Sequence, residues 1–185
     1  MRKIVLLLGI MVIGTLLYAK EKETLKRAYF AGGCFWGVEY YMEKIPGVKE
    51  VVSGFMGGHV KDPSYWDVVY KDTGHFETVE VVYDPKKTSY EALAKNFFEI
   101  HDFTQTDGQG PDIGKQYRSV LFYSDAKEKA VAEKLVAVLT KKGYKVATMI
   151  KKADTFYKAE ENHQDYYERH GKLPYCHSYT KVFDD

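Results

Sequence analysis

The feature that most constrains the fold is a glycine-rich turn around a cysteine, Gly32-Gly33-Cys34-Phe35-Trp36-Gly37. It follows a strand pattern at residues 26–30 and opens a helix pattern at residues 35–44, whose apolar side chains recur on one face. The glycines permit a tight turn, and the start of the helix offers unpaired N–H groups and partial positive charge. We therefore expect a strand-turn-helix unit in which the Cys34 thiol has a lowered pKa and reacts at neutral pH. The alternative is a half-buried structural cysteine in an aromatic core.

The remaining sequence mixes strand and helix patterns without the strict alternation of a doubly wound fold. Strands are expected at residues 48–55, 75–83, 117–123 and 144–150, helices at residues 88–100, 125–139 and 158–170, and a long loop at residues 103–115. Thr88 with Glu91 and Asp125 with Glu128 form candidate capping boxes for the first two of these helices. This order predicts an α+β fold, a two-layer sandwich of helices packed on a mixed sheet.

The first nineteen residues have the pattern of a secretory signal peptide. Arg2 and Lys3 precede an apolar stretch, and Leu17-Tyr18-Ala19 forms a candidate cleavage site. An uncleaved membrane anchor is the alternative, although the apolar run of about fourteen residues is shorter than the roughly 20 that a spanning helix needs. We expect cleavage after Ala19, export to the periplasm or outside the cell, and a single domain over residues 20–185.

The charge balance and the absence of known cofactor motifs narrow the classes of function. Without Arg2 and Lys3, 25 of the 27 Lys and Arg residues remain against 26 Asp and Glu, a net charge of −1. No long charged block is present, which argues against nucleic acid and anionic membranes as partners. The sequence has no phosphate loop or nicotinamide fingerprint, and neither Cys176-His177 nor the His163/His170 pair has zinc-site spacing. We expect no cofactor, no metal and a monomer.

The chain has only two cysteines, Cys34 and Cys176. In an oxidising compartment they could form a structural disulfide that closes a long loop. They could instead form a catalytic pair that cycles between dithiol and disulfide. Their positions favour the second interpretation, because Cys34 lies at a helix start and Cys176 lies in a loop-like tail, residues 172–185, that we expect to be mobile.

A strand pattern places one carboxyl group among apolar neighbours. Because strand side chains alternate, Glu77 shares a face with Val79, Val81 and Tyr83. Burial there would raise its pKa and keep it protonated, as a general acid requires. The alternative is a Glu at the exposed end of the strand. Glu39 is a rival acid, but it follows Cys34 by about 140° of helix rotation and is expected to point away from the thiol in a structural role.

Beyond these residues, a series of motifs resembles one family over about residues 26–177. The motifs are Gly33-Cys34-Phe35-Trp36-Gly37, Gly54-Phe55-Met56-Gly57-Gly58, Pro63-Ser64-Tyr65, Gly74-His75-Phe76-Glu77, Tyr83-Asp84-Pro85, His101-Asp102, Gln116-Tyr117-Arg118-Ser119 and Ala159-Glu160-Glu161-Asn162-His163-Gln164. They resemble the peptide methionine-S-sulfoxide reductases, the A-type enzymes. The resemblance implies a ferredoxin-like core with long wrapping loops, repair of methionine-S-sulfoxide in oxidised proteins or peptides, and an external thioredoxin-like reductant.

The resemblance also implies roles for individual residues. Cys34 would attack the sulfoxide sulfur, and Glu77 would donate the proton. The hydroxyls of Tyr65 and Tyr117 would bind the sulfoxide oxygen. Cys176 would then attack the Cys34 sulfenic acid to form a disulfide.

Three further residues complete the site that the resemblance implies. Phe35 and Trp36 would form an apolar pocket for the S-methyl group, and Asp112 would lie near the substrate backbone. The chain departs from the family pattern at Phe55, where Tyr is usual, and at Phe103, where Pro is usual. These departures bear on loop shape and substrate preference rather than on the reaction.

Two alternatives from other classes stay open on sequence alone. The first is a Cys-dependent hydrolase with Cys34 as nucleophile and His75 as base. The second is an exported binding module in which a Cys34–Cys176 disulfide is structural.

Overall fold

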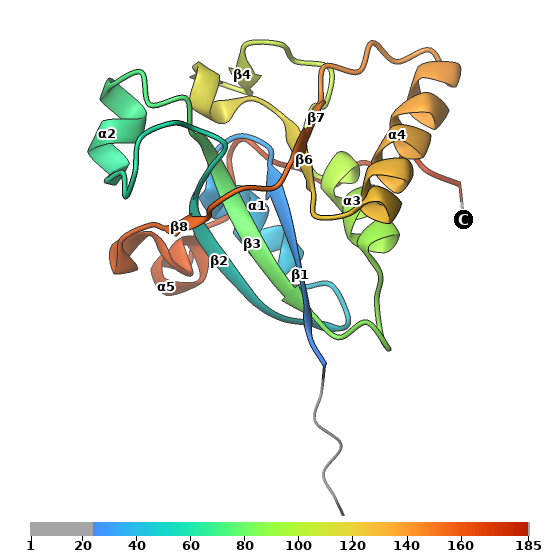
Figure 1. The fold of residues 1–185 in the computed structure, drawn as a ribbon, viewed down its shortest axis with the longest axis horizontal. Helices are drawn as coiled ribbons and strands as arrows, with labels where there is room; N and C mark the ends of the chain where they lie inside the picture. The colour runs from blue at the N-terminus through green and yellow to red at the C-terminus, as the bar shows by residue number, and fades with distance from the viewer. Residues whose placement is uncertain (1–23, 185) are drawn as a thin grey trace, which may run out of the picture.

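The protein is described by a computed structural model over residues 24–184. The main sheet has six strands in the order β7-β6-β1-β3-β2-β8 (Figure 1). These strands are β1 (Lys26–Ala31), β2 (Val48–Met56), β3 (Phe76–Tyr83), β6 (Val120–Tyr123), β7 (Met149–Lys152) and β8 (Tyr157–Lys158). Neighbouring strands are antiparallel except β6 and β7, which are parallel. The predicted mixed sheet is confirmed.

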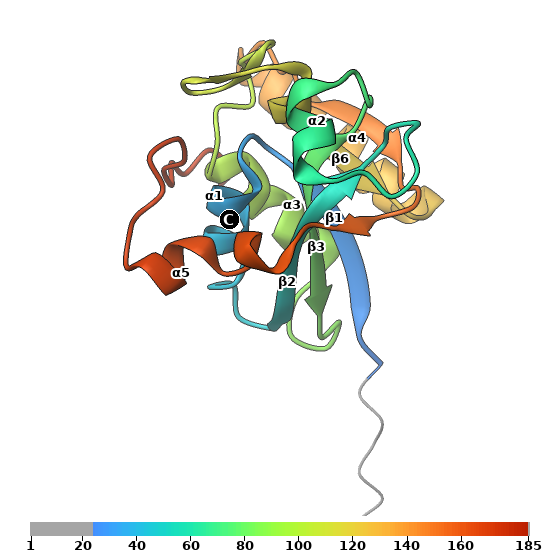
Figure 2. The ribbon, with the colours of Figure 1, turned by 90° about the vertical axis from the view of Figure 1, so that its left-hand side faces the viewer.

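Five helices accompany the sheet in the described part of the chain. They are α1 (Phe35–Met42), α2 (Tyr65–Tyr70), α3 (Tyr90–Glu99), α4 (Ala126–Lys141) and α5 (Tyr166–His170). α1 and α3 lie on one face of the sheet, behind it in Figure 1, and α4 packs beside α3 (Figures 1 and 2). This arrangement confirms the predicted two-layer α+β architecture.

The core lies between the sheet and these helices. Phe30 of β1, Val79 of β3 and Phe35 of α1 are fully buried in it, together with Phe97 of α3. A smaller cluster around Met56 and Phe122 fills the other face, which the segment between β7 and β8 crosses in Figure 1. None of the helices within residues 24–184 is long and apolar enough to span a membrane.

Several local predictions differ from the structure at helix ends. α3 is capped by Ser89, whose hydroxyl accepts the Ala92 N–H at 3.2 Å, rather than by Thr88. Asp125 caps α4 as predicted, since its carboxylate accepts N–H bonds at 2.8 and 2.9 Å. The helix predicted at residues 158–170 is wrong. It is divided into β8, a 3₁₀ turn at Glu161–His163 and α5. Glu160 and Gln164 on either side of the turn have extended ψ values of 153° and 141°, and Asp165 before α5 is left-handed with φ of 51°.

The loop and strand predictions around the site also need correction. The strand expected at residues 117–123 begins only at Val120, because Tyr117 ends a 3₁₀ turn, Lys115–Tyr117. The strand expected at 144–150 is β7, which begins five residues later. The loop at 103–115 contains a small hairpin of β4 (Gly108–Gln109) and β5 (Asp112–Ile113), and α2 was not predicted.

The C-terminal tail lies against the domain. The Ser178 and Thr180 N–H groups donate to the carbonyls of Ile100 and Glu99 at 3.2 and 2.6 Å. The Glu99 carboxylate also accepts the N–H of Val182 at 3.0 Å. The tail is therefore docked in this structure, and its mobility stays a prediction. The signal-peptide prediction concerns residues outside the described range.

Candidate active site

Cys34 lies at the turn between β1 and α1. Gly33 precedes it with φ of 100°, a left-handed conformation that favours glycine. Cys34 is the residue before the first turn of α1, and its carbonyl accepts the Gly37 N–H at 3.1 Å. The predicted strand-turn-helix unit is therefore present. Cys34 is buried, with only 6% of its surface exposed.

The prediction of a lowered Cys34 pKa is wrong. Burial raises the pKa of the Cys34 thiol well above its ordinary value, and the nearby Glu77 and Cys176 raise it further. The Trp36 N–H at the helix start lowers the pKa but does not offset burial. The thiol is consequently protonated in the resting site.

Glu77 is buried beneath α1, with 1% of its surface exposed. Its Oε2 accepts the Phe35 N–H at 3.0 Å, which fixes the carboxyl beside the residue that follows Cys34. Burial raises the Glu77 pKa to about 8, and the charge of Asp112 acts in the same direction. The predicted burial and raised pKa are confirmed, and the alternative of an exposed strand end is wrong. A carboxyl with this pKa holds a proton at neutral pH and can donate it.

Two tyrosines reach the site from separate elements. Tyr65 begins α2, where its N–H donates to Glu160 Oε1 at 3.1 Å, and Tyr117 ends the 3₁₀ turn before β6. Burial raises the pKa of both phenols, that of Tyr65 to about 12. The charges of Glu77 and Cys34 raise the pKa of Tyr65 and of Tyr117 further. Both hydroxyls therefore keep their protons and remain hydrogen-bond donors beside the thiol and the acid.

The β4–β5 hairpin brings Asp112 to the same place. Tyr175 directly precedes Cys176 in the sequence. Its hydroxyl lies 2.9 and 3.0 Å from the two Asp112 carboxylate oxygens and donates to them. Cys176 is 7% exposed, and burial together with the Asp112 charge raises its pKa to about 12. The six titratable residues among the eight predicted site residues therefore interact with one another electrostatically. They are Cys34, Tyr65, Glu77, Asp112, Tyr117 and Cys176.

The two aromatic residues after Cys34 differ in burial. Phe35 is fully buried and forms the back of the site within the core. Trp36 is partly exposed, stacks on Tyr166 at 3.7 Å between ring centroids, and donates its indole N–H to His163 Nδ1 at 3.3 Å. The His163 ring also packs on Tyr65 at 4.3 Å.

Sequence reasoning gave no role to four residues that shape the site. His163 and Tyr166 hold the Trp36 indole, Tyr175 binds Asp112, and His177 contacts the Cys176 thiol. His163 lies within a motif that was quoted for the family resemblance, but the helix predicted there gave no reason to place it against Trp36. Tyr175 and His177 flank Cys176 in a tail without any periodic pattern, so only the fold reveals their contacts.

The hydrolase alternative finds no support at His75. Its Nδ1 accepts the Gly58 N–H at 3.2 Å, so Nε2 carries the hydrogen and donates to the Val60 carbonyl at 2.7 Å. Both ring nitrogens are thereby committed to backbone groups rather than to Cys34. Cys34 and Cys176 are also both free thiols in this structure.

Glu39 is fully buried, and burial raises its pKa to about 8. One carboxylate oxygen from each of Glu39, Glu43 and Asp165 lies within 4.8 Å of the others, the one grouping among residues 24–184 with ligand spacing for a cation. Burial and Asp165 also raise the Glu43 pKa, to about 7. Because the raised pKa values keep protons on Glu39 and Glu43, the three carboxyl groups carry less negative charge and repel one another less. The grouping therefore does not require a metal to neutralise it.

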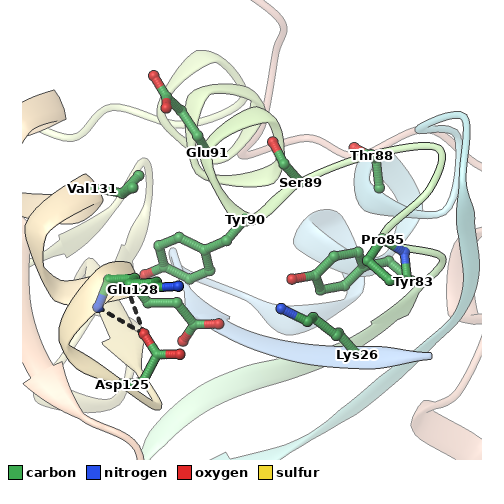
Figure 3. A pocket seen from close by; sticks show the side chains of 11 residues that line it. Lys26, Tyr83, Pro85, Thr88, Ser89, Tyr90, Glu91, Asp125, Glu128 and Val131 are labelled. Atoms are coloured by element: carbon green, nitrogen blue, oxygen red, sulfur yellow. Dashed lines mark hydrogen bonds between the residues drawn. The ribbon is translucent and has the colours of Figure 1, made fainter. Parts of the chain in front are cut away.

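The cavity drawn in Figure 3 lies away from the predicted site. It has a volume of about 320 Å³ and lies between β1 and the first turns of α3 and α4. Several of its polar groups already have partners. The Tyr90 hydroxyl donates to the Phe122 carbonyl at 3.0 Å, the Asp125 carboxylate caps α4, and Glu128 accepts the Ser124 N–H at 2.7 Å. We assign no function to it.

Comparison with known proteins agrees with this geometry. The family model described as peptide methionine sulfoxide reductase matches residues 26–185. The chain belongs to this family. It is 44% identical over 160 residues to the peptide methionine sulfoxide reductase MsrA of Natronomonas pharaonis, covering 84% of this chain and 90% of that protein. It is 46% identical over 162 residues to the MsrA of Methanosarcina mazei, covering 86% and 77%.

Solved structures of this family share the fold. Reduced Mxr1 from Saccharomyces cerevisiae superposes with a TM-score of 0.76 and 36% identity, covering 82% of this chain and 89% of that one. Methionine sulfoxide reductase A of Corynebacterium diphtheriae gives 0.72 and 33%, covering 82% and 77%. Mxr1 has also been solved in complex with Trx2, and that structure gives 0.56 and 28%, covering 84% and 89%. The chain is thus an oxidoreductase that reduces methionine sulfoxide with thiols.

The two departures from the family pattern both lie in the core. Phe55 is fully buried, pairs with Glu77 across β2 and β3, and packs on Phe35 at 5.7 Å between centroids. Phe103 is 5% exposed and packs on Phe98 and Tyr144. Neither side chain carries a titrating group into the reductase site.

Proposed function

We propose that this reductase acts on the S epimer of methionine sulfoxide, free or within proteins, with Cys34 as the nucleophile. The observation that carries the proposal is the grouping of a buried thiol, a protonated carboxyl and two phenol donors, each of which alters the pKa of another. The sulfoxide oxygen would accept hydrogen bonds from Tyr65 and Tyr117. These donors stabilise the negative charge that develops on that oxygen as the S–O bond breaks.

In the first step, the Cys34 sulfur attacks the sulfoxide sulfur. The Cys34 thiol loses its proton, and the Glu77 carboxyl donates a proton to the sulfoxide oxygen. Both groups are neutral acids before the step begins. The sulfoxide S–O bond breaks and the oxygen bonds to Cys34 as a sulfenic acid, while the bond between the two sulfurs breaks and leaves its electron pair on the methionine sulfur, so methionine departs reduced. Glu77 recovers a proton as the thiol proton is released, so the step is balanced.

In the second step, Cys176 attacks the Cys34 sulfenic acid, forms a disulfide and releases water. Cys176 also lines a cavity of about 320 Å³ together with Phe98, His101 and Gln109. This cavity supports access to the Cys176 sulfur from outside the substrate site. A thioredoxin-like dithiol would reduce the disulfide from there, with no bound cofactor required.

The aromatic wall indicates which group on the substrate is recognised. Tyr166 stacks on one face of the Trp36 indole, His163 accepts the indole N–H at the ring edge, and Trp36 is partly open to solvent. The other face of the indole offers an apolar surface for the S-methyl group, while Phe35 closes the site behind it. A small apolar surface of this kind favours a methyl sulfoxide, and methionine sulfoxide in oxidised proteins is the substrate we propose for a repair function.

The S and R epimers of a methionine sulfoxide peptide test this proposal when they are offered separately with dithiothreitol. We expect methionine to form from the S epimer and not from the R epimer. Equal rates on both epimers would contradict the proposed arrangement of donors around Cys34, because the site would then lack stereochemical preference.

We also propose that the protein acts outside the cytoplasm, after export directed by residues 1–19. The support is the sequence pattern alone: Arg2 and Lys3, an apolar stretch and a candidate cut after Ala19. We expect the protein recovered from the producing cells to begin at Lys20 in its intact mass and to fractionate outside the cytoplasm. A mass that retains Met1 in the membrane fraction would instead indicate an anchor.

A further inference from the structure

His177 makes a contact that the reduction of the sulfoxide does not require. Its Nδ1 lies 3.1 Å from the Cys176 Sγ, and its Nε2 lies 2.7 Å from the Gly32 carbonyl oxygen. The side chain therefore connects the second thiol to the turn that carries Cys34. Only 4% of His177 is exposed, so these are the interactions available to it.

The Gly32 contact fixes which ring nitrogen carries the hydrogen. A carbonyl oxygen can only accept, so His177 Nε2 must donate. Burial lowers the His177 pKa to about 4, which keeps the ring neutral at neutral pH. In a neutral ring with hydrogen on Nε2, Nδ1 has a free lone pair, and the Cys176 thiol is the donor to it. The hydrogen bond therefore points from the sulfur to the imidazole.

The position of the His177 imidazole is fixed by its close packing on Gly37 and by hydrogen bonds to the backbone of the tail. A Cβ at position 37 would overlap His177 Nδ1, so Gly37 is required for the imidazole to approach α1. The Gln109 side chain donates to the Cys176 carbonyl at 3.1 Å, and the Tyr41 hydroxyl donates to the His177 carbonyl at 3.4 Å. The thiol and the imidazole are consequently positioned from both sides.

We propose that His177 is the general base of the resolving step, an inference that rests on the proposed function. Its Nδ1 takes the proton from Cys176 as the Sγ attacks the Cys34 sulfenic acid. A base is needed because a protonated thiol is a poor nucleophile. The Asp112 carboxylate also hydrogen-bonds the Cys176 side chain, but both of its oxygens already accept the Tyr175 hydroxyl. His177 Nδ1 is the ring nitrogen at the sulfur, and its other nitrogen is fixed as a donor to Gly32.

The step balances in atoms, protons and electrons. The Cys176 S–H bond breaks, its proton moves to Nδ1, and the sulfur–sulfur bond forms as the Cys34 S–O bond breaks. The leaving hydroxide takes a proton from the Glu77 carboxyl and departs as water. Cys34 is reduced and Cys176 is oxidised, and the imidazolium returns a proton through solvent to the Glu77 carboxylate.

The expected pH dependence follows from the groups that face this pair. They are Cys34 at the start of α1, Tyr41 within α1, Glu77 of β3, His101 after α3, Asp112 of β5, Tyr167 of α5 and Tyr175 in the tail. His101 has a pKa lowered to about 3 and stays neutral, while the Glu77 pKa of about 8 sets the upper limit of the useful range. Between about pH 5.5 and about pH 7.5, the neutral His177 is always available, so a general base gives a flat rate.

The test is a single-turnover reaction with the S epimer and no reductant, in which methionine and the Cys34–Cys176 disulfide are followed separately by rapid quench. In His177→Gln, whose amide can still donate to the Gly32 carbonyl, disulfide formation should slow by about 100-fold or more at neutral pH. It should also rise about tenfold per pH unit, because the reaction must wait for thiolate. Methionine formation in the same samples reports an intact fold. His59→Gln, the same change at an exposed histidine, is the matched control and should leave the disulfide step unchanged.

Two results would overturn the inference. A disulfide rate within threefold of wild type would show that no base acts at Nδ1, and a slow rate that stays flat with pH would show that His177 only shapes the tail. If His177→Gln does not fold, the wild-type profile decides: a flat disulfide rate supports the base, and a tenfold rise per pH unit overturns it. Methionine without any disulfide would refute the role of Cys176, and no methionine at all would refute the proposed function, so the failures are distinguishable.

Discussion

Glu77→Gln should lower the rate of sulfoxide reduction by about 100-fold or more, the usual effect of removing a positioned general acid. The amide has nearly the same shape and can still accept the Phe35 N–H, which Glu77 accepts at 3.0 Å, so the fold should persist. The variant lacks only the acidic proton that the raised pKa of about 8 retains at neutral pH. Methionine formation in a single turnover is the measurement.

The same substitution should make the Cys34 thiol easier to ionise even though the rate of reduction falls. The Glu77 carboxylate is the second largest cause that raises the Cys34 pKa, so removing its charge should lower that pKa. The pH profile of alkylation by iodoacetamide should therefore move to lower pH in Glu77→Gln. A variant with a more easily ionised thiol and a much lower rate would separate nucleophile ionisation from proton donation.

Glu80→Gln is the control for this pair of measurements. Glu80 lies on the same strand as Glu77, three residues along, and binds the Tyr29 hydroxyl at 2.8 Å on the other side of the sheet. It should change neither the rate nor the alkylation profile. Near wild-type reduction by Glu77→Gln would refute the assignment of Glu77 as the acid.

Cys176→Ser should stop after one methionine per enzyme when thioredoxin is the only reductant. The first step does not use Cys176, but a serine hydroxyl cannot form the disulfide that thioredoxin reduces, so steady turnover should fall by at least about 100-fold. Cys34 should then accumulate as a sulfenic acid, which dimedone traps and mass spectrometry detects. Cys34→Ser is the matched variant and should form no methionine at all.

The thermal stability of Cys176→Ser separates this prediction from the binding-module alternative. A structural disulfide would stabilise the fold by a few kcal/mol, about 2–4 in typical cases, so its loss would lower the melting temperature. Both cysteines are free thiols in this structure, and the Cys176 side chain hydrogen-bonds to His177 and to Asp112. We therefore expect little change in melting temperature. Continued turnover with thioredoxin would show that Cys176 is not the resolving thiol.

Local sequence patterns predicted part of the elements that carry the site. The apolar spacing correctly predicted a helix after Cys34, because it depends only on which residues face the core. The alternation in β3 placed Glu77 on an apolar face but left an exposed strand end open, and the structure shows that Glu77 is buried. The family motifs supplied Tyr65, Tyr117 and Asp112, whose local sequence gives no sign of a shared location. The fold brings them together from α2, a 3₁₀ turn and a two-residue strand.

The Cys34 pKa could not be predicted in the same way. The helix start is a local feature and favours the thiolate, as the effect of the Trp36 N–H shows. Burial and the Glu77 charge come from residues distant in sequence, and together they are larger. The contacts of the C-terminal tail could not be predicted either. His177 approaches Gly37 only because the tail and α1 pack against each other in the folded structure.

The central claim is that Cys34 takes the oxygen from the S epimer, and the most direct test compares wild type with Cys34→Ser on each epimer with dithiothreitol. We expect methionine from the S epimer alone with wild type, and none from either epimer with the variant, at unchanged melting temperature. Reduction of the S epimer by Cys34→Ser at a rate near wild type would contradict it, because another group would then have to be the nucleophile.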